Sequence, residues 1–222
     1  MGLSRLAQSL DVIMQGAQAS GPWYLSGGIS AANCVWAYLP KGAADLATSY
    51  VNLANPGTYN ATPRVAPSLS SGWVFTGTQW LTNTYKLQDT SLVIVQFNNN
   101  SGTGYLFSQY KTTGGEKIVV GIVPNLAGVV RYVNGNAYTG VAPVLNSGNL
   151  AVGNGNGYRN GIANATIANS TLTSDQNFAI GAQYPGYGPY SLLSATIVAI
   201  AAYIVAPNDT QVAAVSTAMA AL

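Results

Sequence analysis

Residues 129–138 read VVRYVNGNAY, and this stretch decides the fold class of the chain. β-Branched and aromatic residues stand on both sides of the pair Asn134-Gly135. An Asn-Gly pair readily adopts the two positive φ angles of a type I′ turn, whose twist matches that of the flanking strands. The stretch therefore predicts a two-stranded antiparallel hairpin.

Short runs of similar composition recur from residue 35 onward. Each run is rich in Val, Ile, Tyr, Phe or Trp and is bounded by Gly, Pro, Asn or Ser, as β-strands joined by tight turns are. A second Asn-Gly pair stands at 160–161. Strands do not alternate with helices, which argues against a nucleotide-binding α/β fold. We expect an all-β antiparallel sandwich of the jelly-roll kind. Its expected strands are 35–39, 72–75, 79–81, 91–97, 105–110, 117–123, 128–133, 158–162, 178–182 and 196–204.

Two segments between these runs carry little strand signal. Residues 43–69 contain a turn at 55–57 and two further prolines, and we expect an ordered loop that wraps the sandwich. Residues 146–157 alternate Asn and Gly, which predicts either a mobile loop tip or a tight backbone fitting closely under a neighbour. The glycines at 153–157 lack the Lys-Ser/Thr ending of a phosphate-binding loop.

An amphipathic helix is predicted before the sandwich. Apolar residues fall at spacings of three and four, which places them on one helix face, and the residues at 20–22 end the pattern. We expect a helical extension over 1–22 and a sandwich domain over 23–222. The helix packs either on its own domain or, as an assembly helix, on a neighbouring subunit. Its apolar face consists of Leu3, Leu6, Leu10, Ile13 and Met14.

A second, shorter helix is expected at the C-terminus. Asn208 or Asp209 can cap its first turn, because both side chains accept hydrogen bonds from free backbone N–H groups. Val212, Val215 and Met219 then form an apolar stripe with Leu222. This helix is expected to close one end of the sandwich.

Charge is scarce throughout the 222 residues. Only 6% are charged, against about 25% in typical soluble domains, whereas 48% are hydrophobic. The eight basic residues are scattered, so the clustered charge that nucleic-acid binding requires is lacking. The apolar stretch 195–205 is shorter than the roughly 20 residues that span a bilayer. Residues 1–20 do not resemble a secretory signal.

Few side chains are suited to catalysis or metal binding. With no histidine, the chain cannot form Ser-His-Asp or Cys-His sites, and zinc lacks ligands. The lone cysteine, Cys34, is expected to be a small buried hydrophobic residue. Calcium through Asp89, Asp175 and asparagines is compatible with the composition, but we expect no cofactor and no metal. The acidic residues are too dispersed to suggest the carboxylate pair of a glycosidase: Asp11, Asp45, Asp89, Glu116, Asp175 and Asp209.

Several of these segments together resemble concanavalin A-like (laminin-G-like) jelly-roll domains. The resemblance covers residues 35–222, and residues 41–59 are similar to uncharacterised domains of this kind in phage and environmental sequences. Such domains include lectins, glycanases, adhesion modules and virion appendages, so the fold alone does not give the function. The segments that carry the resemblance are 57–77, 79–81, 91–97, 132–135, 157–161, 180–182 and 195–203.

Aromatic residues, 10% of the chain, provide the candidate binding site. Residues 184–190 read YPGYGPY, and their prolines and glycines predict a surface loop. Exposed tyrosines there suit packing on the sandwich rim, a protein interface or stacking on a sugar. Tyr132 and Tyr138 are expected to be ordinary sheet residues. The candidate ligand or interface residues are Tyr184, Tyr187 and Tyr190, joined by Asn154, Tyr158 and Arg159 if the strand order follows the family.

Together these features predict a non-enzymatic structural or adhesive domain. It would belong to an assembled virion or other extracellular particle, as a capsid decoration or tail appendage. Its expected partners are a second copy of itself or a virion scaffold protein, with surface polysaccharide as a further partner. The alternative is a monomeric, lectin-like carbohydrate-binding module. Neither nucleic acid nor a membrane span is expected.

Overall fold

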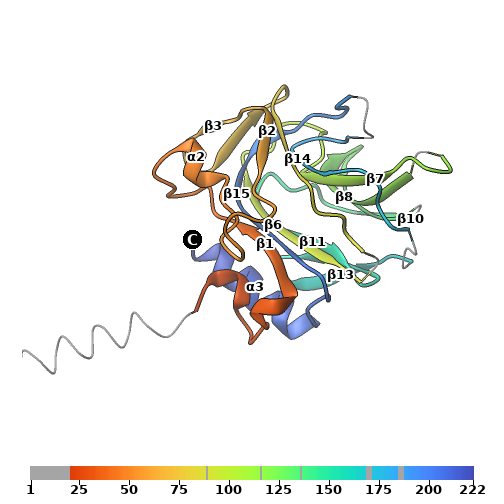
Figure 1. Ribbon diagram of the computed structural model, residues 1–222. Helices are drawn as coiled ribbons and strands as arrows, with labels where there is room; N and C mark the ends of the chain where they lie inside the picture. The colour runs from red at the N-terminus through yellow and green to blue at the C-terminus, as the bar shows by residue number, and fades with distance from the viewer. Residues whose placement is uncertain (1–20, 89, 116, 136, 169–171, 185–187) are drawn as a thin grey trace, which may run out of the picture.

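The computed structural model describes residues 21–222 except 89, 116, 136, 169–171 and 185–187. Two antiparallel sheets pack face to face, which confirms the expected all-β sandwich (Figure 1). Of the predicted N-terminal extension, 1–22, residues 1–20 lie outside the described part. Among the helices of the described part, none has the length and apolarity needed to cross a bilayer.

One sheet has eight strands in the order β13-β12-β11-β6-β15-β4-β3, with β1 also paired to β15. The long strand β15 lies at its centre because it pairs with β1, β4 and β6. The bounds are β1 Cys34–Tyr38, β3 Ser68–Leu69, β4 Trp73–Thr76, β6 Leu92–Asn98, β11 Gly148–Gly153, β12 Asn156–Arg159, β13 Ile162–Thr166 and β15 Ser194–Tyr203.

The other sheet has seven strands in the order β10-β9-β8-β7-β14-β5-β2. The predicted hairpin is present as β9 and β10, which pair Asn134 with Ala137 around Gly135 at φ 66°. The bounds are β2 Thr62–Val65, β5 Trp80–Asn83, β7 Phe107–Lys111, β8 Lys117–Leu126, β9 Val129–Asn134, β10 Ala137–Val141 and β14 Phe178–Ile180.

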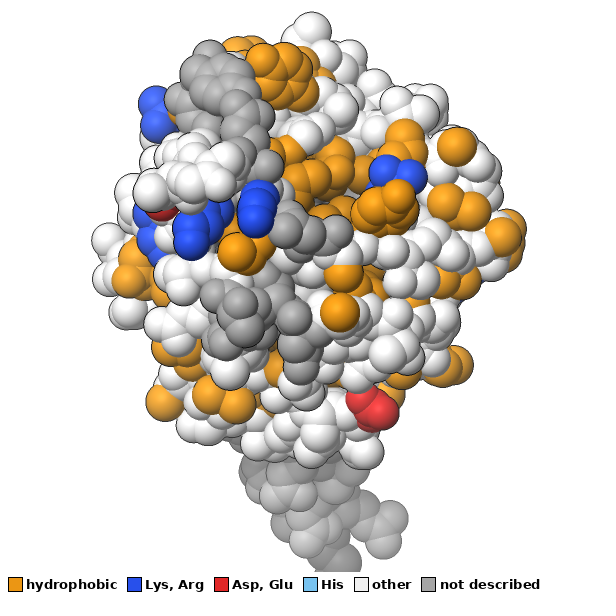
Figure 2. Space-filling model, turned by 90° about the vertical axis from the view of Figure 1, so that its right-hand side faces the viewer, with side chains coloured by type: hydrophobic (Ala, Val, Ile, Leu, Met, Phe, Trp, Pro, Cys, Tyr) orange, Lys and Arg blue, Asp and Glu red, His pale blue; other side chains and the backbone are white. Residues whose placement is uncertain are grey.

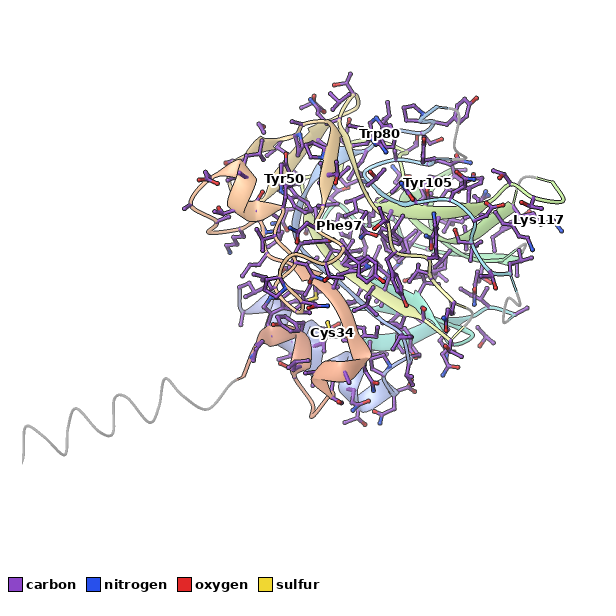
Figure 3. The ribbon with its side chains drawn as sticks, in the orientation of Figure 1. Cys34, Tyr50, Trp80, Phe97, Tyr105 and Lys117 are labelled. Carbon is purple, nitrogen blue, oxygen red and sulfur yellow. The ribbon has the colours of Figure 1, made fainter. Side chains whose placement is uncertain are left out.

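Large aromatic side chains fill the space between the sheets. Trp36 of β1 is fully buried, and its ring centroid lies 5.2 Å from that of Tyr38 and 4.9 Å from that of Phe178. Figure 3 shows Phe97 in this layer, whereas Cys34 lies nearer the C-terminal helix. Burial of these rings supplies much of the apolar area that stabilises the sandwich.

The C-terminal helix packs on the outer face of the eight-stranded sheet. Helix α3 (Asp209–Ala220) begins with a capping box, in which Asn208 and Gln211 each bond to the other's backbone N–H. Val212, Val215 and Met219 are buried, as the sequence predicted, and contact outward residues of β6, β11 and β15. The 3₁₀ turn η1 (Trp23–Leu25) packs beside it.

Within residues 146–157 the chain forms β11 and the start of β12, so the mobile loop tip was wrong, whereas the alternative of a tight backbone agrees with the structure. β11 and β12 make a hairpin whose turn contains Asn154 at φ 49° and Gly155 at φ 74°. Gly153 shows why the glycines are needed, since a Cβ there would lie 2.4 Å from the Ser91 carbonyl oxygen. The backbones approach closely at this position, which leaves no room for a side chain.

Two other boundaries differ from the prediction. The expected strand 158–162 is two strands, because Asn160 and Gly161 turn the chain between β12 and β13 with φ of 49° and 82°. The expected loop 43–69 contains the short helix α2 (Leu46–Ser49) and the strands β2 and β3. Pro63 is tolerated in β2 because this strand lies at the edge of its sheet. The second 3₁₀ turn, η2 (Ala31–Asn33), leads into β1.

Candidate functional site

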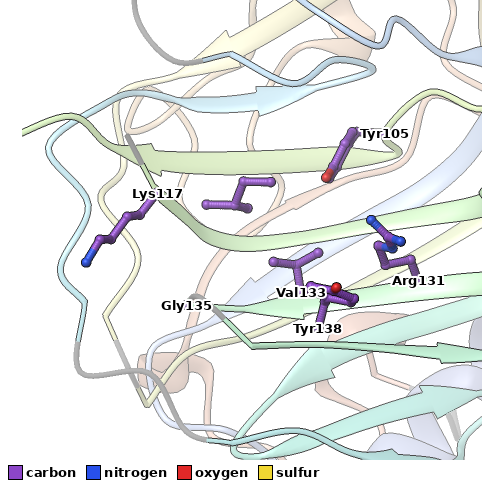
Figure 4. Close-up of a pocket in the computed structure, with 7 residues that line it drawn as sticks. Tyr105, Lys117, Arg131, Val133, Gly135 and Tyr138 are labelled. Carbon is purple, nitrogen blue, oxygen red and sulfur yellow. The ribbon is translucent and has the colours of Figure 1, made fainter. Parts of the chain in front are cut away.

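The outer face of the seven-stranded sheet carries a shallow pocket of about 190 Å³ (Figure 4). Its lining comes from β8, β9 and β10 and from the residue two positions before β7. Figure 2 views this side of the molecule, where apolar side chains gather around a hollow and Lys and Arg side chains lie close by. The pocket is lined by Tyr105, Lys117, Ile118, Arg131, Val133, Gly135 and Tyr138.

Strand alternation directs these side chains outward. Val130 and Tyr132 of β9 point into the core, so Arg131 and Val133 point away from it. On β8, the outward position next to them is Gly121, and the Tyr105 ring lies on it. A Cβ at this glycine would be 2.9 Å from the Tyr105 Cε1 atom, so glycine allows the ring to lie flat against the sheet.

Tyr138 and Arg131 form the exposed edge of the pocket. Tyr138 is 64% exposed, which is unusual for a large aromatic residue in a sheet. The Arg131 Cζ atom lies 4.5 Å from the centroid of this ring, a cation–π distance. The pairing of Arg131 with Gly140 leaves room for the guanidinium to reach the ring diagonally across the hairpin.

Tyr105 lies across the pocket from Tyr138 and Arg131, and it is 7% exposed. Burial raises the pKa of its hydroxyl, while the charge of Arg131 acts in the other direction. The hydroxyl is therefore protonated at neutral pH and is able both to donate and to accept a hydrogen bond. Figure 4 shows the Tyr105 hydroxyl and the Arg131 guanidinium directed into the pocket, whereas Lys117 extends away at its far end.

The predicted tyrosine loop comprises residues 184–190, and its described residue Tyr184 lies on the same outer face. The Tyr184 ring packs on Trp80 with centroids 4.6 Å apart, and its backbone N–H donates to Ser108 Oγ. Tyr190 is 52% exposed and pairs with Gln183 in an isolated bridge. The backbone N–H of Tyr105 donates to the Ser191 carbonyl oxygen at 3.0 Å, so the loop adjoins the pocket. Tyr187 lies outside the described residues.

The other predicted site residues belong to the eight-stranded sheet and are not brought together with the tyrosine loop. Tyr158 is 1% exposed, and its hydroxyl donates to Asp209 Oδ1 at 2.9 Å. Burial first, and then Asp209, raises the pKa of Tyr158 to about 12. The Arg159 guanidinium donates to the carbonyl oxygens of Val141 and Pro143. Asn154 lies in the β11–β12 turn. The side chain of Tyr158 thus has no surface to offer a ligand.

Comparison with known proteins finds similarity of structure only. No family model matches the chain, and no curated protein matches it by sequence. The chain resembles a mutant of Trypanosoma rangeli sialidase displaying trans-sialidase activity, with a TM-score of 0.61 and 15% identity, over 86% of this chain and 34% of the sialidase chain. It therefore spans about a third of that enzyme's length.

Two further structures match over larger shares of their own chains. Domain 4 of AbnA, a GH43 extracellular arabinanase from Geobacillus stearothermophilus solved with arabinotriose, has a TM-score of 0.56 and 13% identity. That match covers 83% of this chain and 98% of the domain. The binding domain of botulinum neurotoxin DC, solved with rat synaptotagmin II, has a TM-score of 0.54 and 9% identity over 86% of this chain and 52% of that one. The likeness is one of fold.

The three acidic residues that the structure describes all support local structure. Asp45 caps α2 through the Thr48 backbone N–H, and Asp209 accepts from Tyr158. Asp175 accepts hydrogen bonds from the backbone N–H groups and hydroxyls of Thr112 and Thr113. Burial acts to raise the pKa of Asp175, but these hydrogen bonds outweigh it and hold the pKa well below its ordinary value. Within the described residues, no group of three potential metal ligands is found.

Cys34 is a buried structural residue, as predicted. It is 5% exposed, and burial raises the pKa of its thiol to about 12. The reactive thiolate form is therefore negligible at neutral pH.

A second hollow lies on the opposite side of the sandwich. It is an apolar groove of about 660 Å³ between η1 and α3. Gly21, the first described residue, lines it together with Trp23, Ser26, Ala214, Thr217, Ala218, Ala221 and Leu222. The small side chains of α3 leave space for another element to approach closely.

Proposed function

We propose that this chain is a non-catalytic carbohydrate-binding domain and that its ligand occupies the pocket around Tyr105, Arg131 and Tyr138. The observation that carries the proposal is the Tyr138 ring, exposed at the edge of a pocket that also holds a protonated hydroxyl and a guanidinium. Among the large hydrophobic side chains that the structure describes, few are as exposed.

This arrangement suits a sugar. One face of a pyranose ring is apolar and packs on an aromatic side chain, while the surrounding hydroxyls require hydrogen-bond partners. Tyr138 offers the aromatic surface, and the Tyr105 hydroxyl and the Arg131 guanidinium offer the hydrogen-bond partners. Pockets for drug-sized ligands measure about 300–1,000 Å³, so a pocket of about 190 Å³ suits a terminal or single sugar residue.

The fold comparison supports the same class of ligand. Domain 4 of the arabinanase AbnA was solved with arabinotriose, and this chain covers nearly all of that domain. The hydrogen bonds of the described carboxylates agree with a non-catalytic role. Asp45, Asp175 and Asp209 each accept hydrogen bonds that stabilise local structure. Glycoside hydrolysis requires two carboxyl groups across the scissile bond.

Replacing Tyr138 with alanine should weaken glycan binding about tenfold, as loss of an aromatic stacking contact does. The measurement is a glycan array that includes arabino-oligosaccharides, followed by titration calorimetry on the best ligand. Ile162→Ala is the matched control, because Ile162 is 71% exposed on β13 of the other sheet. Wild-type protein that binds no glycan, or a Tyr138→Ala variant that binds as well as wild type, would contradict the proposal.

A second candidate function is self-association within a particle, such as a virion. The apolar groove between η1 and α3 favours it, because a helix with the apolar stripe Leu3, Leu6, Leu10, Ile13 and Met14 complements such a surface. In this proposal the stripe of one copy lies in the groove of the next. A location on a virion or other extracellular particle is part of the same proposal.

Self-association should disappear when residues 1–20 are deleted, and also in an Ala218→Glu variant that places a charge in the groove. Ala220→Glu is the control, because Ala220 lies on the exposed face of the same helix turn. Light scattering after size-exclusion chromatography measures the mass. If all four proteins have the same number of subunits, the groove is not an assembly surface.

A further inference from the structure

Charge is distributed unequally between the two sheets. The strands of the seven-stranded sheet contain four basic residues and no acidic residue, whereas those of the eight-stranded sheet contain one basic residue, Arg159. In a chain with only 6% charged residues, this places half of the basic residues in one sheet. They are Arg64, Lys111, Lys117 and Arg131.

Two of these cations face each other. Lys111 of β7 and Lys117 of β8 are directly opposite in the antiparallel register. Like charges at such positions destabilise a strand pair, so an anion near them is favourable. Asp175 lies close by and is engaged by Thr112 and Thr113. Within the described residues, no carboxylate forms an ion pair with Arg131 or Lys117. The side chain of Glu116, which precedes Lys117, is outside that part.

Contact with Tyr138 restricts the orientation of the Arg131 side chain. Its guanidinium stacks near the Tyr138 ring, which restricts its orientation, and the groups at its edge remain directed toward the pocket (Figure 4). A planar guanidinium donates two parallel hydrogen bonds to a carboxylate, an arrangement that lysine does not reproduce. The pocket wall around it includes Val133 and Ile118, so the pairing is partly shielded from water.

We infer that the pocket prefers a sugar that carries a carboxylate, of the uronic or sialic type, over a neutral sugar. This rests on the proposed function, since it names the ligand class of the same site. The carboxylate receives two hydrogen bonds from Arg131, the sugar ring contacts Tyr138, and the Tyr105 hydroxyl bonds to a ring substituent. Lys117 at the far end of the pocket adds longer-range attraction that salt weakens.

The test measures binding of matched ligands by calorimetry. A galactose oligomer is compared with the galacturonic acid oligomer of the same length, and a sialylated oligosaccharide is compared with its neutral counterpart. A sulfated galactose oligomer serves as an anionic ligand without a carboxylate. We expect at least one carboxylated ligand to bind about tenfold tighter than its neutral partner, the effect of one charge-assisted bidentate pair. Arg131→Gln should weaken binding of the carboxylated ligand about tenfold more than binding of its neutral partner, and Arg131→Lys should restore only part of that difference. Lys117→Gln should have a smaller effect that vanishes in high salt.

Arg64→Gln is the control, because it removes the same charge from β2 at the opposite edge of the sheet. Equal binding of neutral and carboxylated ligands would overturn the inference and leave the proposed function standing. Tighter binding of the sulfated ligand, or an equal loss for neutral and carboxylated ligands in Arg131→Gln, would also overturn it. Binding of none of the ligands, neutral or acidic, would overturn the proposed function itself.

Discussion

Replacing Asn52 with alanine should lower the free energy of unfolding by about 3 kcal/mol or more, because buried backbone groups lose their partners. Asn52 is fully buried. Its Oδ1 accepts from the backbone N–H groups of Ala37 and Ala54, and its Nδ2 donates to the carbonyl oxygens of Val35 and Thr58. Hydrogen bonds of the Asn52 side chain thus connect residues 52–60 to β1.

In a thermal denaturation experiment, this loss corresponds to a melting temperature about 6–12 °C below that of wild type for a domain of this size. Asn55→Ala is the control, because Asn55 is exposed in the same segment. The melting temperature of Asn55→Ala should lie within about 2 °C of that of wild type. An Asn52→Ala protein as stable as the control would show that water replaces the side chain and that the segment does not depend on it.

Replacing Gly104 with alanine should also destabilise the fold, by about 2–3 kcal/mol, because the added methyl group meets backbone rather than a movable side chain. A Cβ at Gly104 would lie 2.1 Å from the Leu192 carbonyl oxygen. The next residue, Tyr105, donates its backbone N–H to Ser191. The substitution therefore pushes apart the two segments that join the tyrosine loop to the pocket.

The expected result is a lower melting temperature together with weaker ligand binding. Gly188→Ala is the control, since no atom lies within 4 Å of a Cβ built there and its φ is not in the positive region. Chemical denaturation gives the stability, and calorimetry gives the affinity. If Gly104→Ala loses stability but binds ligand normally, the junction at Tyr105 does not position the pocket.

Local sequence patterns were sufficient for much of the fold. The hairpin at Asn134-Gly135 and the capped helix α3 were predictable because their determinants lie within a few residues of each other. β11 was missed although Leu150, Ala151 and Val152 are buried in it. The surrounding Asn and Gly residues resemble loop sequence, and the close backbone contact at Gly153 that requires them involves β6, far away in the chain.

The candidate site was only partly predictable for a similar reason. The tyrosine loop was expected to be on the surface, and its described residue Tyr184 packs on the outer face of the seven-stranded sheet. Tyr105 and Arg131 were not singled out, because they come from separate strands and only the sheet order places them together. Tyr138 was expected to be an ordinary sheet residue. Its place on the edge strand β10 leaves it exposed, whereas Tyr132 on β9 points into the core.

The positions of η1 and α3 determine how the pocket is presented. Both pack on the outer face of the eight-stranded sheet, where Figure 1 shows α3. The pocket lies on the outer face of the other sheet. Gly21 and the C-terminal residue Leu222 line one groove, so the backbone enters and leaves the sandwich on the same side. Anything anchored through either end is separated from the pocket by the full thickness of both sheets, and a row of anchored copies would point their pockets toward the surrounding medium.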